Sequence, residues 1–236
     1  MTQGTSTKSE PKPTFDAGAV LFDLDGTLIH TAPDLVTAVN NMLTALGDQP
    51  YPAERITGWV GNGAARLVKR ALTGEFDGEP EPIRFEQGMA LFKEHYAKVL
   101  CVDSKPYPGV VAALTDLSER GFRLACVTNK PKDFTEPLLD ALDLSRFFEI
   151  VLSGDSLNEQ KPHPLPLQHA CRKLGVPPIR TVLVGDSLND VQAAKSAGMP
   201  VVCVRFGYAD PAALTKAAPD AMIDAFQELP GLIKRC

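Results

Sequence analysis

The stretch LFDLDGTLI, residues 21–29, decides how the rest of the chain is interpreted. It places Asp23 and Asp25 one residue apart among apolar residues that are typical of a buried strand. Gly26 and Thr27 follow at once, and Gly26 is the residue that lets the backbone turn there. The pattern predicts a buried strand that ends on two carboxylates, a costly arrangement unless other groups compensate their charges.

Composition limits the classes of protein to consider. The chain has 236 residues, of which 44% are hydrophobic and 22% charged, as in a soluble globular protein with a full core. Its net charge of −5 and lack of a long basic run argue against nucleic acid as a partner. The absence of a run of about 18 apolar residues argues against a membrane.

Two further features bear on location. The five cysteines are widely spaced and form no C-x-x-C pair, which favours reduced thiols in a cytoplasmic protein. The polar, proline-containing residues 1–17 lack the apolar segment of a signal peptide, and we expect them to form a disordered tail.

Five short apolar runs, several of them apolar nearly throughout, predict strands covered on both faces, as in a parallel sheet. These runs are residues 19–24, 122–129, 149–154, 181–186 and 200–206. Helical patterns alternate with the later runs, at residues 109–121, 132–144, 165–175 and 188–198. A final run at 221–233 favours an edge strand and a short helix. The fold class expected is α/β, a doubly wound parallel sheet with a Rossmann-like core.

One interval interrupts this alternation. Residues 30–106 contain no convincing strand, and the spacing of apolar residues predicts helices over 32–47, 63–72 and 83–100. This is too much helix for one crossover between parallel strands. We therefore expect an inserted all-helical domain at 30–106, within a core formed by residues 18–29 and 107–236.

Polar side chains follow four of the predicted strands, at the edge where ligands bind in doubly wound sheets. They are Asp23, Asp25, Thr27, Thr128, Asn129, Lys161, Asp186 and Asp190. Four acids at one edge repel one another unless a cation lies among them. Oxygen ligands without histidine or thiolate favour a hard ion, Mg²⁺ above all.

This set of residues suits phosphoryl chemistry. A carboxylate can attack phosphorus to give an aspartyl-phosphate, provided that the repulsion between the two anions is removed. Lys161 supplies an ammonium group for that purpose, and Thr128 supplies a hydroxyl donor. The second acid, Asp25, can protonate the leaving oxygen and later activate water.

The segments DLDGT (23–27), VTNK (127–130), KPHP (161–164) and GDSLND (185–190) resemble the four ordered motifs of the haloacid dehalogenase superfamily. The resemblance covers essentially the whole chain after the tail. It implies that Asp23 is the nucleophile and Asp25 the general acid–base. It also implies that the helical insertion is a cap that closes over the site.

The resemblance assigns the remaining residues as well. Thr128, Asn129 and Lys161 would bind the phosphoryl group of the substrate. Mg²⁺ would be held by Asp23, the backbone carbonyl of Asp25, and Asp186, with Asp190 in the second shell or bound through water.

Within the superfamily, Asp25 favours hydrolysis or transfer of phosphate esters over cleavage of carbon–halogen bonds. The segments APDL (32–35), WVGNG (59–63) and YPGV (107–110) resemble those of bacterial phosphoglycolate phosphatases. This implies hydrolysis of 2-phosphoglycolate to glycolate and phosphate, with the amides of Gly61 and Gly63 facing the substrate carboxylate. His30 departs from this resemblance, because the relatives usually carry an acid there.

Alternatives stay open at this point. The substrate could be a sugar phosphate or an amino-sugar acid phosphate, and a phosphomutase is a further possibility. A phospho-receiver switch shares the doubly wound sheet and the acidic cluster, but its acceptor aspartate ends a middle strand of the sequence, whereas Asp23 ends the first. The partner expected is a small phosphorylated metabolite, and the protein is expected to be a monomer or homodimer.

Overall fold

The structure, a computed structural model, describes residues 13–236. Its central sheet has six parallel strands in the order β6-β5-β2-β7-β8-β9. The strands are β2 (Ala19–Phe22), β5 (Arg123–Val127), β6 (Ile150–Leu152), β7 (Thr181–Gly185), β8 (Val201–Val204) and β9 (Ala221–Ile223). All five predicted runs contain a strand, and β9 lies at the edge as expected. The predicted α/β fold with a parallel sheet is therefore confirmed.

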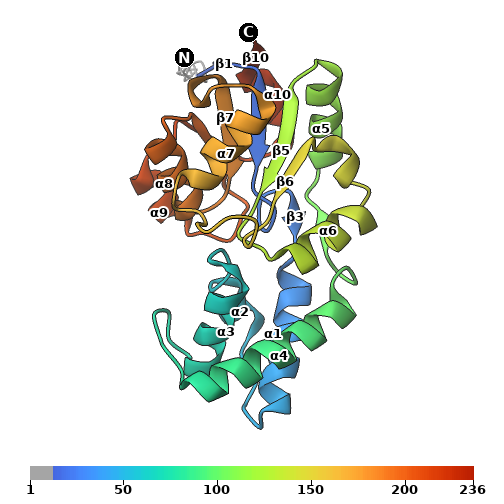
Figure 1. The fold of residues 1–236 in the computed structure, drawn as a ribbon, viewed down its shortest axis with the longest axis vertical. Coiled ribbons are helices and arrows are strands. Elements are labelled where there is room, and N and C mark those ends of the chain that lie inside the picture. Colours follow the sequence, from blue (N-terminus) through green and yellow to red (C-terminus); the bar gives the residue numbers. More distant parts are fainter. Residues whose placement is uncertain (1–12) are drawn as a thin grey trace, which may run out of the picture.

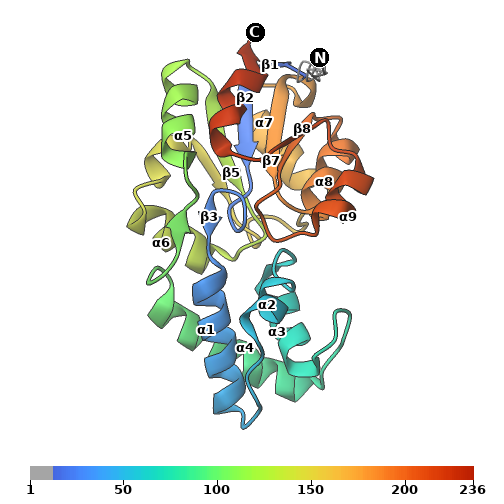
Figure 2. The same ribbon diagram turned by 180° about the vertical axis from the view of Figure 1, so that it is seen from behind.

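Helices cover both faces of the sheet (Figures 1 and 2). One face packs against α5 (Val110–Glu119), α6 (Lys132–Ala141) and α10 (Leu229–Leu232). The other face packs against α7 (Leu165–Leu174), α8 (Leu188–Ala197) and α9 (Pro211–Ala217). Short 3-10 turns occur at η1 (Ser145–Phe147), η2 (Pro178–Arg180) and η3 (Phe226–Glu228).

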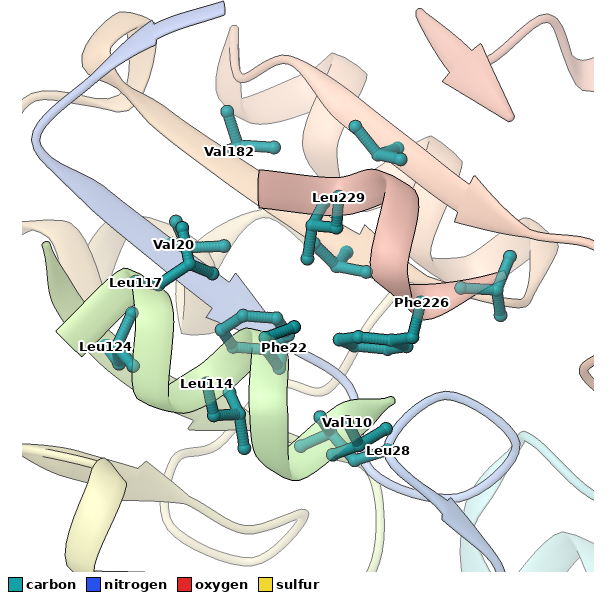
Figure 3. Close-up of a cluster of buried hydrophobic side chains, with 14 of the residues drawn as sticks. Val20, Phe22, Leu28, Val110, Leu114, Leu117, Leu124, Val182, Phe226 and Leu229 are labelled. Atoms are coloured by element: carbon teal, nitrogen blue, oxygen red, sulfur yellow. The ribbon is translucent and has the colours of Figure 1, made fainter. Parts of the chain in front are cut away.

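Side chains of strand β2 show why its sequence is apolar throughout. Successive side chains of a strand point to opposite faces of the sheet. Val20 and Phe22 lie in the cluster with Leu114 of α5 and Phe226 of η3 (Figure 3), whereas Leu21 packs in the cluster on the opposite face. Because both faces are covered by helices, neither set of positions meets water.

The predicted insertion is an all-helical cap, which lies below the core in the view of Figure 1. It comprises α1 (Ala32–Ala45), α2 (Ala53–Thr57), α3 (Gly63–Thr73) and α4 (Pro82–Val99). The short helix α2 had not been predicted. Two linkers join cap and core through an antiparallel pair, β3 (Ile29–His30) with β4 (Lys105–Pro106). The cap has its own apolar cluster, and Phe134 of core helix α6 inserts into it.

The prediction of a disordered tail is wrong at its last three residues. Strand β1 (Phe15–Ala17) pairs in parallel with β10 (Ile233–Arg235). Ala17 is fully buried in the core, and this apolar contact stabilises the short strand against the rest of the domain. Residues 1–12 of the predicted tail lie outside the described residues. Among residues 13–236, no helix combines the length and the apolar character needed to cross a membrane.

Candidate active site

The loop after β2 places the two sequential aspartates at the carboxyl end of the sheet. The amide of Asp23 still donates to the carbonyl of Val184 (2.9 Å), so it continues the pairing of β2 with β7. The chain then turns, and the carbonyl of Leu24 accepts from the amides of Leu28 and Ile29, both at 3.0 Å. Gly26 has φ of +84° in this turn, which confirms the prediction that a glycine is needed there.

Three buried carboxylates gather at this edge of the sheet. Oxygen atoms of Asp23, Asp186 and Asp190 lie within 4.8 Å of one another. Lys161 lies beside two of them, with its Nζ 2.8 Å from Asp23 Oδ1 and 2.7 Å from Asp190 Oδ1. The topology of the sheet thus brings together acids and a lysine that are up to 167 residues apart in sequence.

Asp186 is held in place from several sides. Its Oδ1 accepts from the Thr27 hydroxyl (3.1 Å), and its Oδ2 accepts from the backbone amide of Tyr208 (2.7 Å). A Cβ at Gly26 or at Gly207 would overlap the Asp186 side chain, so these two backbones approach it as closely as glycine allows. This carboxylate is therefore fixed before any ligand arrives.

Asp190 serves the site through its neighbours. Its Oδ2 accepts from the amide (3.1 Å) and hydroxyl (2.6 Å) of Ser187 in a capping box at the start of α8. Its Oδ1 accepts from Lys161. The side chain, with no exposed surface, thus joins the helix terminus to the lysine. Capping of helix α8 by Asp190 is compatible with its predicted role as a second-shell or water-bound ligand of a metal.

The charges in this cluster do not balance. Burial raises the pKa of Asp23 to about 6, although Lys161 opposes the shift. Burial also raises the pKa of Asp186 well above its ordinary value, and the charges of Asp23 and Asp190 add to the effect. Burial disfavours the charge of Lys161, but the two neighbouring aspartates outweigh it and raise the lysine pKa. The carboxylates therefore need more positive charge than Lys161 provides.

Sequence reasoning missed Lys130, a buried charged residue of the site. Its Nζ lies 3.1 and 3.3 Å from the two carboxylate oxygens of Asp25 and 2.6 Å from the hydroxyl of Tyr96, which belongs to cap helix α4. Lys130 lies in the quoted segment VTNK, directly after two predicted site residues. Its position just after the end of a predicted strand could have indicated that Lys130 belongs to the site.

A divalent cation fits the donor set. When ionised, Asp23, Asp186 and Asp190 carry three negative charges, of which Lys161 offsets one. Carboxylate oxygens are the ligands of Mg²⁺ and similar hard cations. Asp23 and Asp186 are suited to hold such an ion. Burial raises the pKa of both, so their negative charges are unfavourable there and a bound cation would stabilise them.

Thr128 and Asn129 follow β5 at the same edge. The Thr128 hydroxyl accepts from the amide of Lys130 (3.1 Å), which leaves its hydrogen available for a ligand. The Asn129 side chain contacts the backbone of Lys161 on both sides, donating to its carbonyl (2.8 Å) and accepting from its amide (3.1 Å). The structure therefore places the side chain of Asn129 as a support for Lys161.

A small cavity of about 40 Å³ lies between core and cap. Asp23, Asp25, Thr128 and Lys161 line its core side. On the cap side it is lined by Val60, Gly61, Gly63, Ala64, Leu67 and Tyr96. Both predicted cap glycines thus face the same cavity as the aspartates.

The loop that carries the two glycines is docked on the core. Gly63 is the first residue of α3, and no side chain caps that helix at Asn62. The Gly61 carbonyl accepts from Asn189 Nδ2 of α8 (3.1 Å). A Cβ at Gly63 would come within 3.1 Å of the Asn129 carbonyl. The start of α3 therefore closes one wall of the cavity.

Tyr208 connects the site to the root of the cap. Its hydroxyl accepts from the amides of Thr31 (2.7 Å) and Ala32 (2.9 Å) at the start of α1, while its own amide donates to Asp186. His30, exposed beside this contact, has Nδ1 3.3 Å from the hydroxyls of Tyr107 and Tyr208. His30 thus lies where the first linker leaves the core.

Comparison with known proteins agrees with this geometry. Residues 17–198 match the model of the haloacid dehalogenase-like hydrolase family. The chain is 49% identical over 217 residues to a phosphoglycolate phosphatase of Nitrosospira multiformis, covering 92% of this chain and 96% of that protein.

Solved structures lead to the same group. A predicted phosphoglycolate phosphatase from Haemophilus somnus has a TM-score of 0.85 and 35% identity, covering 91% of this chain and 97% of the other. CbbY from Rhodobacter sphaeroides, solved with phosphate, has a TM-score of 0.76 and 29% identity, covering 92% of this chain and 99% of the other. The chain belongs to the haloacid dehalogenase-like hydrolases and is a phosphoric monoester hydrolase.

Proposed function

We propose that this protein hydrolyses 2-phosphoglycolate to glycolate and phosphate, with Mg²⁺ as cofactor and an aspartyl-phosphate on Asp23 as intermediate. The observation that carries the chemistry is the cluster of Asp23, Asp186 and Asp190 with Lys161 beside it, since Asp23 and Lys161 of this cluster line the cavity between core and cap. The relatives named phosphoglycolate phosphatase support the choice of substrate.

In the first half-reaction, a carboxylate oxygen of Asp23 attacks phosphorus. The bond between phosphorus and the ester oxygen breaks, and the carboxyl group of Asp25 gives its proton to the leaving glycolate oxygen. Lys161 and Thr128 face the phosphoryl oxygens from the cavity wall. A bound Mg²⁺ would offset the repulsion between the Asp23 carboxylate and the phosphate.

In the second half-reaction, water attacks the phosphorus of the aspartyl-phosphate. The Asp25 carboxylate takes a proton from that water, and the bond between phosphorus and the Asp23 oxygen breaks. Asp23 is then a carboxylate again, and Asp25 is protonated for the next substrate. One aspartate pair thus serves both halves of the reaction.

The wall of the cavity on the cap side supports a substrate with a second anionic group. Gly61 and Gly63 lie in that wall, at the start of α3. The amides at the start of α3 are suited to an anion, because the first N–H groups of a helix have no partner within the helix. We assign the carboxylate of 2-phosphoglycolate to the wall formed by Gly61 and Gly63.

The test is a panel of phosphate-release assays in the presence and absence of Mg²⁺. It compares 2-phosphoglycolate with sugar phosphates and amino-sugar acid phosphates, with Asp23→Asn as the blank. The matched control is Asp16→Asn, an exposed acid on β1. We expect kcat/KM for 2-phosphoglycolate to exceed the others by about a hundredfold, or roughly 2.7 kcal/mol.

Each part of the proposal has its own refuting result. Full turnover by Asp23→Asn would refute the nucleophile, and so would the absence of a phosphorylated Asp23 peptide after rapid acid quenching. A preference for a sugar phosphate would refute the substrate alone. A variant of CbbY from Rhodobacter sphaeroides has been solved with xylulose-(1,5)bisphosphate, so sugar phosphates belong in the panel. Release of only one equivalent of phosphate would indicate a switch rather than an enzyme.

A further inference from the structure

Three side chains that line the cavity come from different parts of the chain and meet at the Lys130 Nζ. Asp25 comes from the loop after β2, Lys130 from the loop after β5, and Tyr96 from cap helix α4. The lysine side chain is 3% exposed and the Tyr96 residue 1%. A buried ammonium group needs such partners, because an unpaired buried charge is strongly destabilising.

The hydroxyl of Tyr96 reaches Lys130 only because the cap is docked on the core. The ring of Tyr96 packs against the ring of Phe134 on core helix α6, with centroids 4.8 Å apart, and stacks on Phe92 of its own helix at 5.4 Å. These aromatic contacts fix the ring between cap and core. A cap that swings away from α6 takes the phenol with it.

Lys130 in turn fixes the carboxylate of Asp25. Its Nζ is within 3.3 Å of both Asp25 oxygens, and the Lys130 backbone amide is tied to the Thr128 hydroxyl. Asp25 is the group that must align with the leaving oxygen and then with the attacking water. Proton transfer depends steeply on this alignment.

We propose that Lys130 is a positioning residue for Asp25, and that Tyr96 makes this positioning conditional on a docked cap. The inference rests on the proposed function, since it assigns Asp25 the proton transfers described above. When the cap leaves, Lys130 loses its phenol partner and its hold on Asp25 loosens. Acid–base catalysis is then available only while the cap closes the cavity over a substrate.

The test uses two small phosphates of matched size with different leaving groups. Ethyl phosphate needs a proton on its leaving oxygen, whereas acetyl phosphate releases acetate without one. The variants are Tyr96→Phe, Lys130→Met and their combination. The control variants are Tyr51→Phe, a cap tyrosine packed against Trp59, and Lys132→Met, an exposed lysine on α6.

The quantity compared is kcat/KM, which reports the steps up to departure of the leaving group. We expect Tyr96→Phe to lower kcat/KM for ethyl phosphate by about tenfold, and Lys130→Met by about a hundredfold, within the range of general acid catalysis. Acetyl phosphate should be affected much less. The double variant should be no worse than Lys130→Met, because Tyr96 acts through Lys130.

Several outcomes would overturn the proposal. Equal losses on both phosphates indicate a general structural role, and additive losses in the double variant indicate that Tyr96 acts independently. In a parallel assay of the same variants with 2-phosphoglycolate, a loss confined to KM would make Lys130 a ligand of the substrate carboxylate instead. Wild-type protein that releases no phosphate from any of these compounds would refute the proposed function itself, so the two failures are distinguishable.

Discussion

When divalent cations are removed, the free energy of unfolding should fall as the pH rises. We expect Asp23 to be the residue responsible. The side chain is 12% exposed and lies within 4.8 Å of two other carboxylates. Without a cation among them, the native state resists losing the Asp23 proton. The perturbation is therefore chelation of metal, combined with the substitution Asp23→Asn.

The size of the effect follows from the pKa of Asp23, which burial raises from 3.8 to about 6. In the unfolded chain the same carboxyl titrates near its ordinary value, so the native state binds more protons between these two pH values. Stability then falls with rising pH across this window. At about 1.4 kcal/mol for each unit, the free energy of unfolding falls by about 3 kcal/mol in total.

The assay is urea unfolding of the wild type, Asp23→Asn and the control Asp16→Asn, across this pH range with a chelator or with saturating Mg²⁺. The informative quantity is the difference in free energy of unfolding between wild type and Asp23→Asn at each pH. We expect that difference to fall by about 3 kcal/mol without metal. It should not fall with Mg²⁺, since a bound cation favours the ionised carboxylate. Asp16→Asn should retain the wild-type slope.

Parallel curves for wild type and Asp23→Asn in the chelator would refute this reasoning. They would mean that Asp23 titrates alike in the folded and unfolded states, and that Lys161 alone compensates the cluster. A fall that persists in saturating Mg²⁺ would refute the assignment of Asp23 as a metal ligand.

Three other changes have defined expected results. Gly207→Ala puts a methyl group against Asp186, and the Mg²⁺ concentration for half-maximal activity should rise by about ten- to a hundredfold. Asn129→Ala removes both hydrogen bonds to the Lys161 backbone, so kcat/KM for the best substrate should fall by at least about tenfold. Phe134→Ala empties a buried site between cap and core, which should lower the free energy of unfolding in urea by about 3–5 kcal/mol.

The fold was predictable where a segment's own residues determine its structure. Strand β8 is apolar throughout and β7 is apolar after Thr181, because both of their faces are covered, and this pattern distinguishes them from surface strands. Strand β1 was missed because three residues are too few to show a periodic pattern. Its partner β10 is also distant in sequence, with Phe15 paired to a residue 218 positions later. The five-residue helix α2 is too short for an amphipathic pattern.

The site was predictable to the extent that it lies at strand ends. Asp23, Asp186 and Lys161 were expected at one edge, and the structure brings them together. The contacts of Asn129 and Lys130 were not predictable, because the backbone of Lys161 and the phenol of Tyr96 reach them only through the three-dimensional arrangement of loops and cap. Nothing in the spacing of a single sequence encodes such contacts between distant segments.

The position of Tyr208 gives the cap a mechanical property. Its amide donates to Asp186, and its hydroxyl accepts from the amides at the start of α1. Tyr208 therefore lies at the point about which α1 would rotate relative to the core. Helix α1 has 14 residues. At that length it is about 20 Å long, and a pivot of roughly 10° at its root moves its far end by about 3–4 Å. Because Tyr208 joins the fixed Asp186 carboxylate to the start of α1, such a rotation would move the outer end of the cap by about the width of a water molecule relative to the site.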